Sequence, residues 1–560
     1  MKLSVFSVGG LVALLQACGS LACTIVAVGR DASTSGFPMV SHTDDSGPDT
    51  TDIRLVRVPR KKWPAGSKRP LYLWADGYPR VVSAKLSPEY APAAGQHETQ
   101  AIGSIPQVPE TFAYWDMDYG VQNEKGLSIG ESTCTARTVG WPASPDKPYG
   151  YNRMGIEDLS KIALERCATA RCAVQTMGNL AVEQGFYSAD SGEPEHPAYS
   201  GSAEGLVVAD AVPGDLWIFN VMTGKNNASA IWAAERVPAD HVVAVGNTFT
   251  IRKMNLSDPG NFLFSPGVTQ LAEEMGWWKP SDDKPGIFDF FGSYGYTPDA
   301  STEGSEAMAQ KMTNVLTYYS GRRMWRIFSL LSPAEGAKLD PEKGNLPKTQ
   351  DPYPGSVPAP KGSVTAHMVM NVLRDHYEGT PYDLTKGMSA GPFGSPNRGP
   401  VPPRSIPGQW ERAISMHRSS WSYVLEAKAR GRSVTWFGYD SPHGTAYLPF
   451  FGAATHGAPA DFHSHEGYMS KFSTDVAWWA FNMVNQYTDL NFALINKYVR
   501  EKSSVVEDEA AKSVLLWEAE ADRAANESAA MDLLTTRSNA FADDKVREWW
   551  KFAFSLFAKF

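Results

Sequence analysis

The order of the hydrophobic patterns along the chain constrains the fold most. Short apolar, β-branched runs separated by turn residues dominate up to about Phe451, whereas the chain from about Ser473 onward has helical spacing. Helical segments interrupt the strands, but strand and helix do not alternate regularly. A doubly wound parallel sheet is therefore not expected, and we predict the α+β class.

The first part of the chain predicts a hairpin and a helix pair. Thr24 to Val28 forms an apolar run, Asp31 to Gly36 has turn chemistry, and Met39 to His42 is apolar again. Apolar residues at helical spacing predict a helix over Ile156 to Cys167, and Thr169 is the expected N-cap of a second helix.

Further strands and helices follow from the same patterns. Strand and turn alternation is expected at 112–135, a β-meander at 204–251, strands at 433–439 and 446–451, exposed loops at 339–362 and 388–407, and C-terminal helices that include 505–526 and 543–560. We expect one domain over residues 23–470, with a helical region over 471–560 packed on it.

The first 22 residues resemble a signal peptide. Lys2 precedes an apolar run from Leu3 to Leu15, and Ser20-Leu21-Ala22 forms a small-x-small cleavage site. We expect cleavage before Cys23 and a secreted mature protein. Leu15 to Gly19 also resembles a lipoprotein signal, which leaves a lipid anchor on Cys18 as an alternative.

Composition excludes several partners and frameworks. The net charge of the 560 residues is -9 without a basic run, which disfavours nucleic acid and anionic membranes. The four cysteines after Cys18 are Cys23, Cys134, Cys167 and Cys172, too few for a disulfide scaffold. A continuous helix would keep Cys167 and Cys172 apart, whereas a break near Thr169 permits a disulfide, so both readings stay open.

Cys23 is the strongest candidate for chemistry because it directly follows the expected cleavage site. Cleavage there gives one residue both a thiol and a free α-amine. The amine has a pKa near 7.7 to 8, so it can act as a general base for the thiol. The alternative is an ordinary buried or disulfide-bonded cysteine.

Several long segments of the sequence resemble the dipeptidase A family of N-terminal-nucleophile hydrolases. They are CTIVAVGRDAS with HTDDSG, YGVQNEKGLSIGESTC, WAAERVPADHVVAVGN, GRRMWRIFSLLSP, GTPYDLT, GPFGSPNR, WFGYDSPHGTAYLPFFG and AWWAFNMVNQY. The resemblance runs from Cys23 nearly to the end. It implies a four-layer αββα N-terminal-nucleophile fold with additional C-terminal helices, and cysteine-type hydrolysis of dipeptides.

Five site residues are implied position by position. Cys23 matches the nucleophile, and Asp45 matches a carboxylate that orients the N-terminal amine. Asn123 matches an oxyanion-hole amide, and Asn247 matches a second polar residue near the nucleophile. Arg323 is the expected arginine of the site.

Some of these assignments have rivals. Arg322 and Arg326 compete with Arg323 or form a solvated helix face together with it. Related acylases carry arginine three residues before the orienting aspartate, where this chain has His42, so His42 shares that role or another residue supplies the charge. Asp45, Asn123 and Asn247 are also common turn formers.

No cofactor or metal is expected. The motif His463-Ser464-His465-Glu466 contains metal-ligand residue types, but it lies in a Gly- and Ala-rich stretch without partner spacing. The leading interpretation is a secreted dipeptidase acting on small peptides, and a homo-oligomer stays open. The alternatives are an acylase-type amide hydrolase of the same fold and an inactive secreted interaction protein.

Overall fold

The computed structural model describes most of the chain after Ala22. The described residues are 23–46, 51–73, 81–144, 148–188, 192–197, 199, 201–295, 315–342, 353–397, 412–465 and 469–560. The expected signal peptide, Glu466 and much of the two expected loops lie outside these residues.

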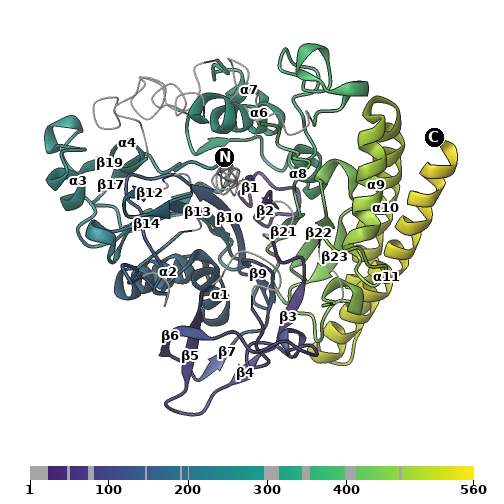
Figure 1. Ribbon diagram of the computed structural model, residues 1–560, viewed down its shortest axis with the longest axis horizontal. Helices are drawn as coiled ribbons and strands as arrows, with labels where there is room; N and C mark the ends of the chain where they lie inside the picture. Colours follow the sequence, from purple (N-terminus) through teal and green to yellow (C-terminus); the bar gives the residue numbers. More distant parts are fainter. Residues whose placement is uncertain are drawn as a thin grey trace, which may run out of the picture.

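Two antiparallel sheets form the centre of the molecule (Figure 1). The seven-stranded sheet has the order β20 (Ser356–Pro358), β16 (His241–Val245), β1 (Ile25–Val28), β2 (Met39–Asp44), β21 (Trp421–Glu426), β22 (Val434–Tyr439) and β23 (Leu448–Phe451). The eight-stranded sheet has the order β18 (Phe262–Phe264), β15 (Ala230–Val237), β14 (Leu216–Thr223), β13 (Ala203–Ala209), β10 (Ser128–Cys134), β9 (Gly120–Asn123), β8 (Tyr114–Asp116) and β3 (Val56–Val58). This antiparallel pairing agrees with the predicted α+β class.

The expected hairpin is present as β1 and β2, with Ala27 opposite Val40. The expected meander is correct only for β13, β14 and β15, which are neighbours in one sheet. β16 instead joins the other sheet, where Val245 lies opposite Ile25. The local pattern predicts the strand but not its partner, because pairing is decided by packing between distant segments.

The two sheets contact each other where β10 crosses β1 and β2. At Gly130 a Cβ atom would lie 2.6 Å from the carbonyl oxygen of Ser41 and 2.7 Å from a methyl carbon of Val40. Only glycine fits so close an approach. The next residue, Glu131, is thereby placed beside His42 on β2.

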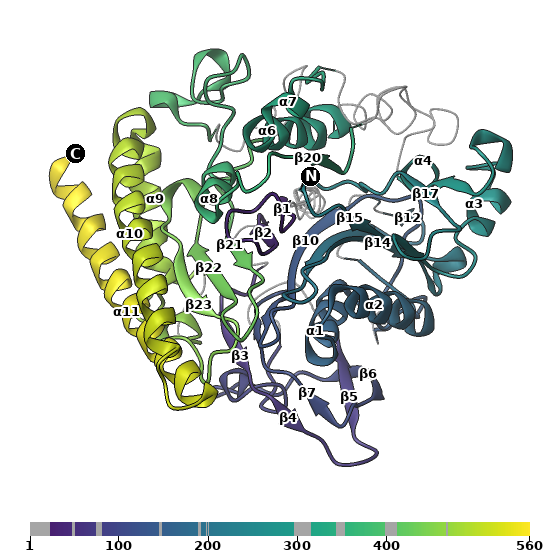
Figure 2. The same cartoon turned by 180° about the vertical axis from the view of Figure 1, so that it is seen from behind.

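Helices α1 (Ile156–Arg166) and α2 (Ala170–Gln184) pack on the eight-stranded sheet (Figure 2). The helical conformation is interrupted between α1 and α2. Thr169 caps α2 by accepting a hydrogen bond from the N–H of Cys172 at 3.3 Å. The break allows Cys167 and Cys172 to form a disulfide, with their Cα atoms 5.6 Å apart. This resolves the two readings in favour of the bridge.

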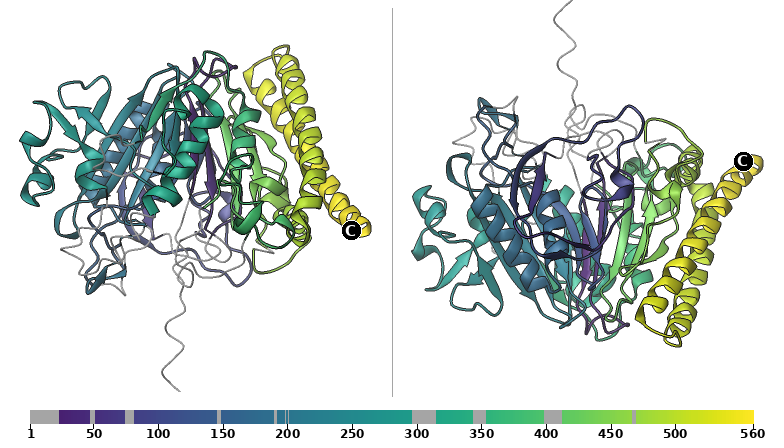
Figure 3. Two further views of the ribbon diagram at one scale, coloured as in Figure 1. Left: turned by 90° about the horizontal axis from the view of Figure 1, so that it is seen from above. Right: turned by 90° about the horizontal axis from the view of Figure 1, so that it is seen from below.

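Helices α8 (Ala366–Leu373), α9 (Trp478–Leu490), α10 (Phe492–Ala521) and α11 (Glu527–Lys559) cover the seven-stranded sheet (Figures 1 and 3). The last two are longer than predicted because their buried stripes include small and polar residues. In α10 the polar Ser503 is buried between Val499 and Val506. No helix among the described residues is long and apolar enough to cross a membrane.

Candidate active site

Cys23 lies two residues before β1, an inner strand of the seven-stranded sheet, and is completely buried. Its carbonyl oxygen accepts hydrogen bonds from Arg323 Nη1 at 2.9 Å and Ser132 Oγ at 3.4 Å. The next residue, Thr24, donates its backbone N–H to Thr43 Oγ1 at 3.0 Å. Both sheets therefore hold the backbone of the candidate nucleophile.

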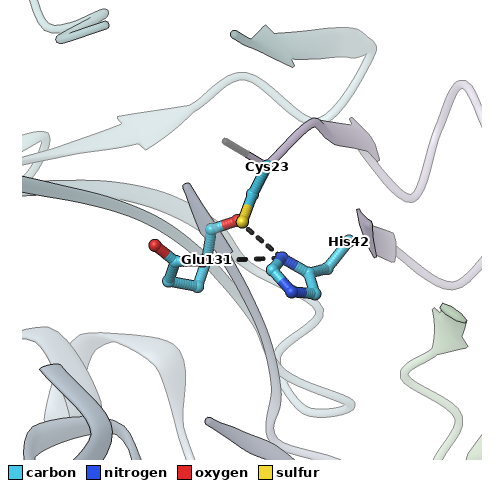
Figure 4. Close-up of side chains that lie close together, drawn as sticks. All are labelled: Cys23, His42 and Glu131. Carbon is cyan, nitrogen blue, oxygen red and sulfur yellow. Dashed lines mark hydrogen bonds and ion pairs between the residues drawn. The ribbon is translucent and has the colours of Figure 1, made fainter. Parts of the chain in front are cut away.

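The Cys23 thiol lies in an acidic environment. Its Sγ, a ring nitrogen of His42 and a carboxylate oxygen of Glu131 lie within 4.8 Å of one another (Figure 4). Burial raises the pKa of the thiol well above its usual value, and the negative charges of Glu131, Asp44 and Asp45 raise it further. A backbone hydrogen bond from Asp45 acts in the opposite direction. Such a thiol needs a base to become a nucleophile.

Asn247 is fixed beside the nucleophile by hydrogen bonds on three sides. Its backbone has a φ of 59°, a conformation that asparagine tolerates better than most residues. Its N–H donates to Ser132 Oγ at 3.1 Å, and its Nδ2 donates to the Thr133 carbonyl oxygen at 2.8 Å. Its Oδ1 accepts from Arg323 Nη2 at 2.6 Å. These contacts orient the side-chain amide, whose Nδ2 carries a second hydrogen.

Of the three neighbouring arginines, the structure brings Arg323 to Cys23. All three lie on α6 (Arg322–Leu331), which follows a π-helical turn over Val315–Gly321 and packs on β16. The guanidinium of Arg322 lies over the ring of Tyr382, 3.5 Å from its centroid. Arg326 instead forms an ion pair with Asp375 at 2.7 Å.

Asp45 is completely buried, and Arg412 is the cation that pairs with it. The carboxylate also accepts hydrogen bonds from Ser419 Oγ and from Thr43 Oγ1, the latter at 3.0 Å. Burial raises the pKa of Asp45, and the charge of Arg412 opposes this shift. Arg412 Nη1 also lies 3.3 Å from Asn247 Oδ1. No motif in the sequence points to Arg412, because only the fold brings it to the site.

The ring of His42 contacts Glu131, whereas Asp45 is paired with Arg412. Its Nδ1 lies 2.7 Å from the carbonyl oxygen of Glu131. Because a carbonyl oxygen only accepts, Nδ1 carries the hydrogen and donates it. The ring packs among Tyr119, Trp421 and Tyr423. His42 therefore connects β2 to β10 beside the thiol, and Arg412 supplies the charge on Asp45.

Asn123 has a different environment from the one expected of an oxyanion-hole residue. Its Nδ2 donates to the carbonyl oxygens of Leu164 at 2.9 Å and Cys167 at 2.8 Å. Its Oδ1 accepts from the N–H groups of Lys125 and Leu127, both at 3.0 Å. Both amide hydrogens are thus used to join the turn after β9 to the end of α1. These contacts favour a structural role for Asn123, and its expected part in the oxyanion hole stays a prediction.

A second buried carboxyl group, that of Glu204 on β13, faces Glu131. Burial, and next the neighbouring carboxyl group of Glu131, raise the pKa of Glu204 well above its usual value. Thr133 Oγ1 donates to Glu131 at 2.9 Å, and Ser188 Oγ donates to Glu204 at 2.6 Å. The charged form of Glu204 is therefore disfavoured by its burial and by the neighbouring carboxylate. The sequence held a signal for this pair, since each glutamate interrupts an otherwise weakly polar strand.

The described residues contain one group with metal-ligand spacing, which consists of Cys23, His42 and Glu131. The Nδ1 hydrogen of His42 is directed at a carbonyl oxygen, so this nitrogen has no lone pair for a metal. In the motif considered from the sequence, His465 Nε2 lies 3.2 Å from the carbonyl oxygen of Glu89. These contacts do not assemble a ligand set around His465.

Comparison with known proteins identifies one protein family over most of the chain. The family model of Peptidase family C69 matches residues 22–504, which places the chain among the hydrolases. The chain belongs to Peptidase family C69.

Individual relatives are distant but cover most of the chain. A protein named "Probable dipeptidase" from Salmonella dublin is 23% identical over 454 residues, which cover 79% of this chain and 83% of the relative. A "Dipeptidase" from Bifidobacterium longum is 23% identical, covering 77% of this chain and 71% of the relative. A "Probable dipeptidase A" from Streptococcus pyogenes serotype M3 is 22% identical, covering 91% of each chain.

Proposed function

We propose that this chain is a secreted cysteine-type dipeptidase that forms an acyl-enzyme on Cys23. The observation that carries the proposal is a pair of hydrogen bonds to Cys23. Its carbonyl oxygen accepts one from Arg323 on α6 and one from Ser132 on β10. A cysteine held in this way keeps its thiol in one position relative to Asn247. Membership of Peptidase family C69 and the names of the relatives support peptide bonds as the substrate.

The proposed reaction begins with removal of residues 1–22, which frees the α-amine of Cys23. The amine takes the thiol proton, and the sulfur attacks the carbonyl carbon of the dipeptide. Asn247 Nδ2 donates its second hydrogen to the oxyanion that develops. The peptide C–N bond breaks as the proton passes to the amine of the C-terminal residue, which leaves. Water then hydrolyses the thioester and releases the N-terminal residue.

Export and fold are parts of the same proposal. The disulfide Cys167–Cys172 suits a chain that folds in an oxidising compartment. The apolar segment before Cys23 suits a signal peptide. We also propose that the helices on the outer sides of the two sheets form the four-layer αββα arrangement of N-terminal-nucleophile hydrolases, with Cys23 between the sheets.

The decisive experiment is hydrolysis of a panel of unblocked dipeptides by the mature chain and by Cys23→Ser. The substitution changes one atom, so the fold should be retained, but turnover should fall by orders of magnitude because a hydroxyl is far less nucleophilic than a thiolate. A mature Cys23→Ser enzyme with wild-type turnover would sink the proposal. If the chain cleaves acyl-amides but not dipeptides, it is an acylase-type amide hydrolase. If it cleaves neither class of substrate, an inactive interaction protein is favoured.

A further inference from the structure

Among the described residues, neither Glu131 beside the thiol nor Glu204 next to it forms an ion pair with a lysine or an arginine. Glu131 and Glu204 are completely buried. Apart from the carboxyl group of the other residue, neither Oε2 atom has a hydrogen-bond partner in the described part of the chain. The ring of His42, 3.8 Å from Glu131 Oε2, directs its Nδ1 hydrogen to a backbone oxygen.

The contrast with Asp45 is informative. Asp45 lies equally deep, but Arg412 neutralises it. Any negative charge on the Glu131–Glu204 pair lies at a completely buried position. Such a charge is costly unless a cation binds to it. A positively charged group bound beside Glu131 and Glu204 would therefore stabilise the pair.

The distance of the pair from the thiol identifies this cation. In an unblocked dipeptide the α-ammonium is bonded to the carbon next to the scissile carbonyl. When the carbonyl carbon lies about 3 to 3.5 Å from the attacking sulfur, the ammonium lies within a few ångströms of the same sulfur. A Glu131 carboxylate oxygen lies within 4.8 Å of Cys23 Sγ.

We infer that Glu131, paired with Glu204, binds the α-ammonium group of the substrate and so restricts the enzyme to peptides with a free N-terminus. This inference rests on the proposed dipeptidase function and deepens it. Glu131 determines specificity because a substrate without the ammonium leaves the charge of the pair buried and unpaired. Blocked acyl-amides are rejected for the same reason.

The test compares two substrates that differ only in the amino group, alanyl-alanine and propionyl-alanine. Glu131→Gln removes the negative charge and keeps the size of the side chain. We expect kcat/KM for alanyl-alanine to fall about 10²-fold, while kcat/KM for propionyl-alanine changes no more than a few-fold. The ratio of the two values is the readout, since a merely structural defect lowers both equally.

A matched control is Glu157→Gln on α1. Glu157 acts on Glu204 through its charge but is not part of the cluster around the thiol. This variant should keep the wild-type ratio. If Glu131→Gln does not fold, Glu204→Gln takes its place, and its ratio should move in the same direction by a smaller factor.

The outcomes separate the inference from the proposed function. Wild-type enzyme that cleaves neither dipeptide nor blocked substrate overturns the function. Wild-type enzyme that prefers alanyl-alanine, together with a Glu131→Gln variant that keeps this preference, overturns the inference alone. A similar loss on both substrates would also overturn it, because the pair would then serve the amine of Cys23 or the fold.

Discussion

The guanidinium of Arg323 donates a hydrogen bond to the carbonyl oxygen of Cys23 at 2.9 Å, although the two residues are 300 positions apart in the chain. The same nitrogen donates to Thr24 Oγ1 at 2.8 Å, and the other terminal nitrogen donates to Asn247 Oδ1. One planar group therefore fixes the backbone of the nucleophile and the amide expected to bind the oxyanion.

Replacing Arg323 by lysine should lower kcat about 10²-fold. A single ammonium on a flexible stem does not reproduce the fork that reaches Cys23, Thr24 and Asn247 together. Steady-state kinetics on a dipeptide checks this. Arg322→Lys is the matched control, because the guanidinium of Arg322 stacks on Tyr382, and kcat should then stay within a few-fold of wild type.

The secreted protein should begin at Cys23. The small-x-small sequence Ser20-Leu21-Ala22 directs cleavage to this bond, and catalysis needs the α-amine that cleavage frees. N-terminal sequencing or intact-mass analysis of active protein measures the start directly. Active protein that starts upstream of Cys23, or at a lipid-modified Cys18, contradicts the proposed mechanism.

The reactivity of the thiol should depend on Glu131 in a direction set by charge. The negative carboxylate raises the pKa of Cys23, so Glu131→Gln should lower that pKa. Below the wild-type pKa the variant then holds more thiolate, and iodoacetamide should react faster with it. The two rates should converge at a pH above both pKa values. Slower alkylation of the variant at neutral pH would contradict the electrostatic account.

Asn247 and Asn123 should respond differently to alanine. Asn247→Ala removes the oriented donor, so kcat should fall about 10²- to 10³-fold with little change in KM. Asn123→Ala leaves the buried carbonyl oxygens of Leu164 and Cys167 without a donor, at a cost of about 1–3 kcal/mol each. Its melting temperature should drop, while kcat per folded molecule stays within a few-fold. The opposite pattern would restore Asn123 to the oxyanion hole.

Hydrolysis of dipeptides should not require added metal. The proposed nucleophile is activated by its own amine, and the Nδ1 of His42 is engaged with a carbonyl oxygen. Activity before and after EDTA treatment measures this. Loss of activity that zinc restores would require a metal-based mechanism instead.

The sequence predicted the parts of this molecule that depend on local patterns. The hairpin before and after Gly36, the capping role of Thr169 and the helical character of the C-terminal region follow from spacing and turn chemistry. Arg323 was selected from three arginines by family resemblance, and the structure places it against Cys23.

Other features depend on contacts that no local pattern encodes. β16 has the composition of a meander strand but pairs with β1 in the other sheet. Arg412 reaches Asp45 from 367 positions away, so its partner appears only in the folded chain. Asn123 lies in a sequence segment that resembles the family. Its side-chain amide donates hydrogen bonds to the end of α1, which lies outside that segment.

The close approach of Gly130 to β2 has a consequence for how activity appears during folding. His42 belongs to one sheet and Cys23 directly precedes a strand bridge of it, Glu131 and Ser132 belong to the other sheet, and the two sheets approach each other closely at Gly130. A chain that has formed either sheet alone has no complete site. Catalytic activity regained on refolding should therefore lag behind the return of secondary structure. The recovery of activity would then measure the formation of the contact between the two sheets.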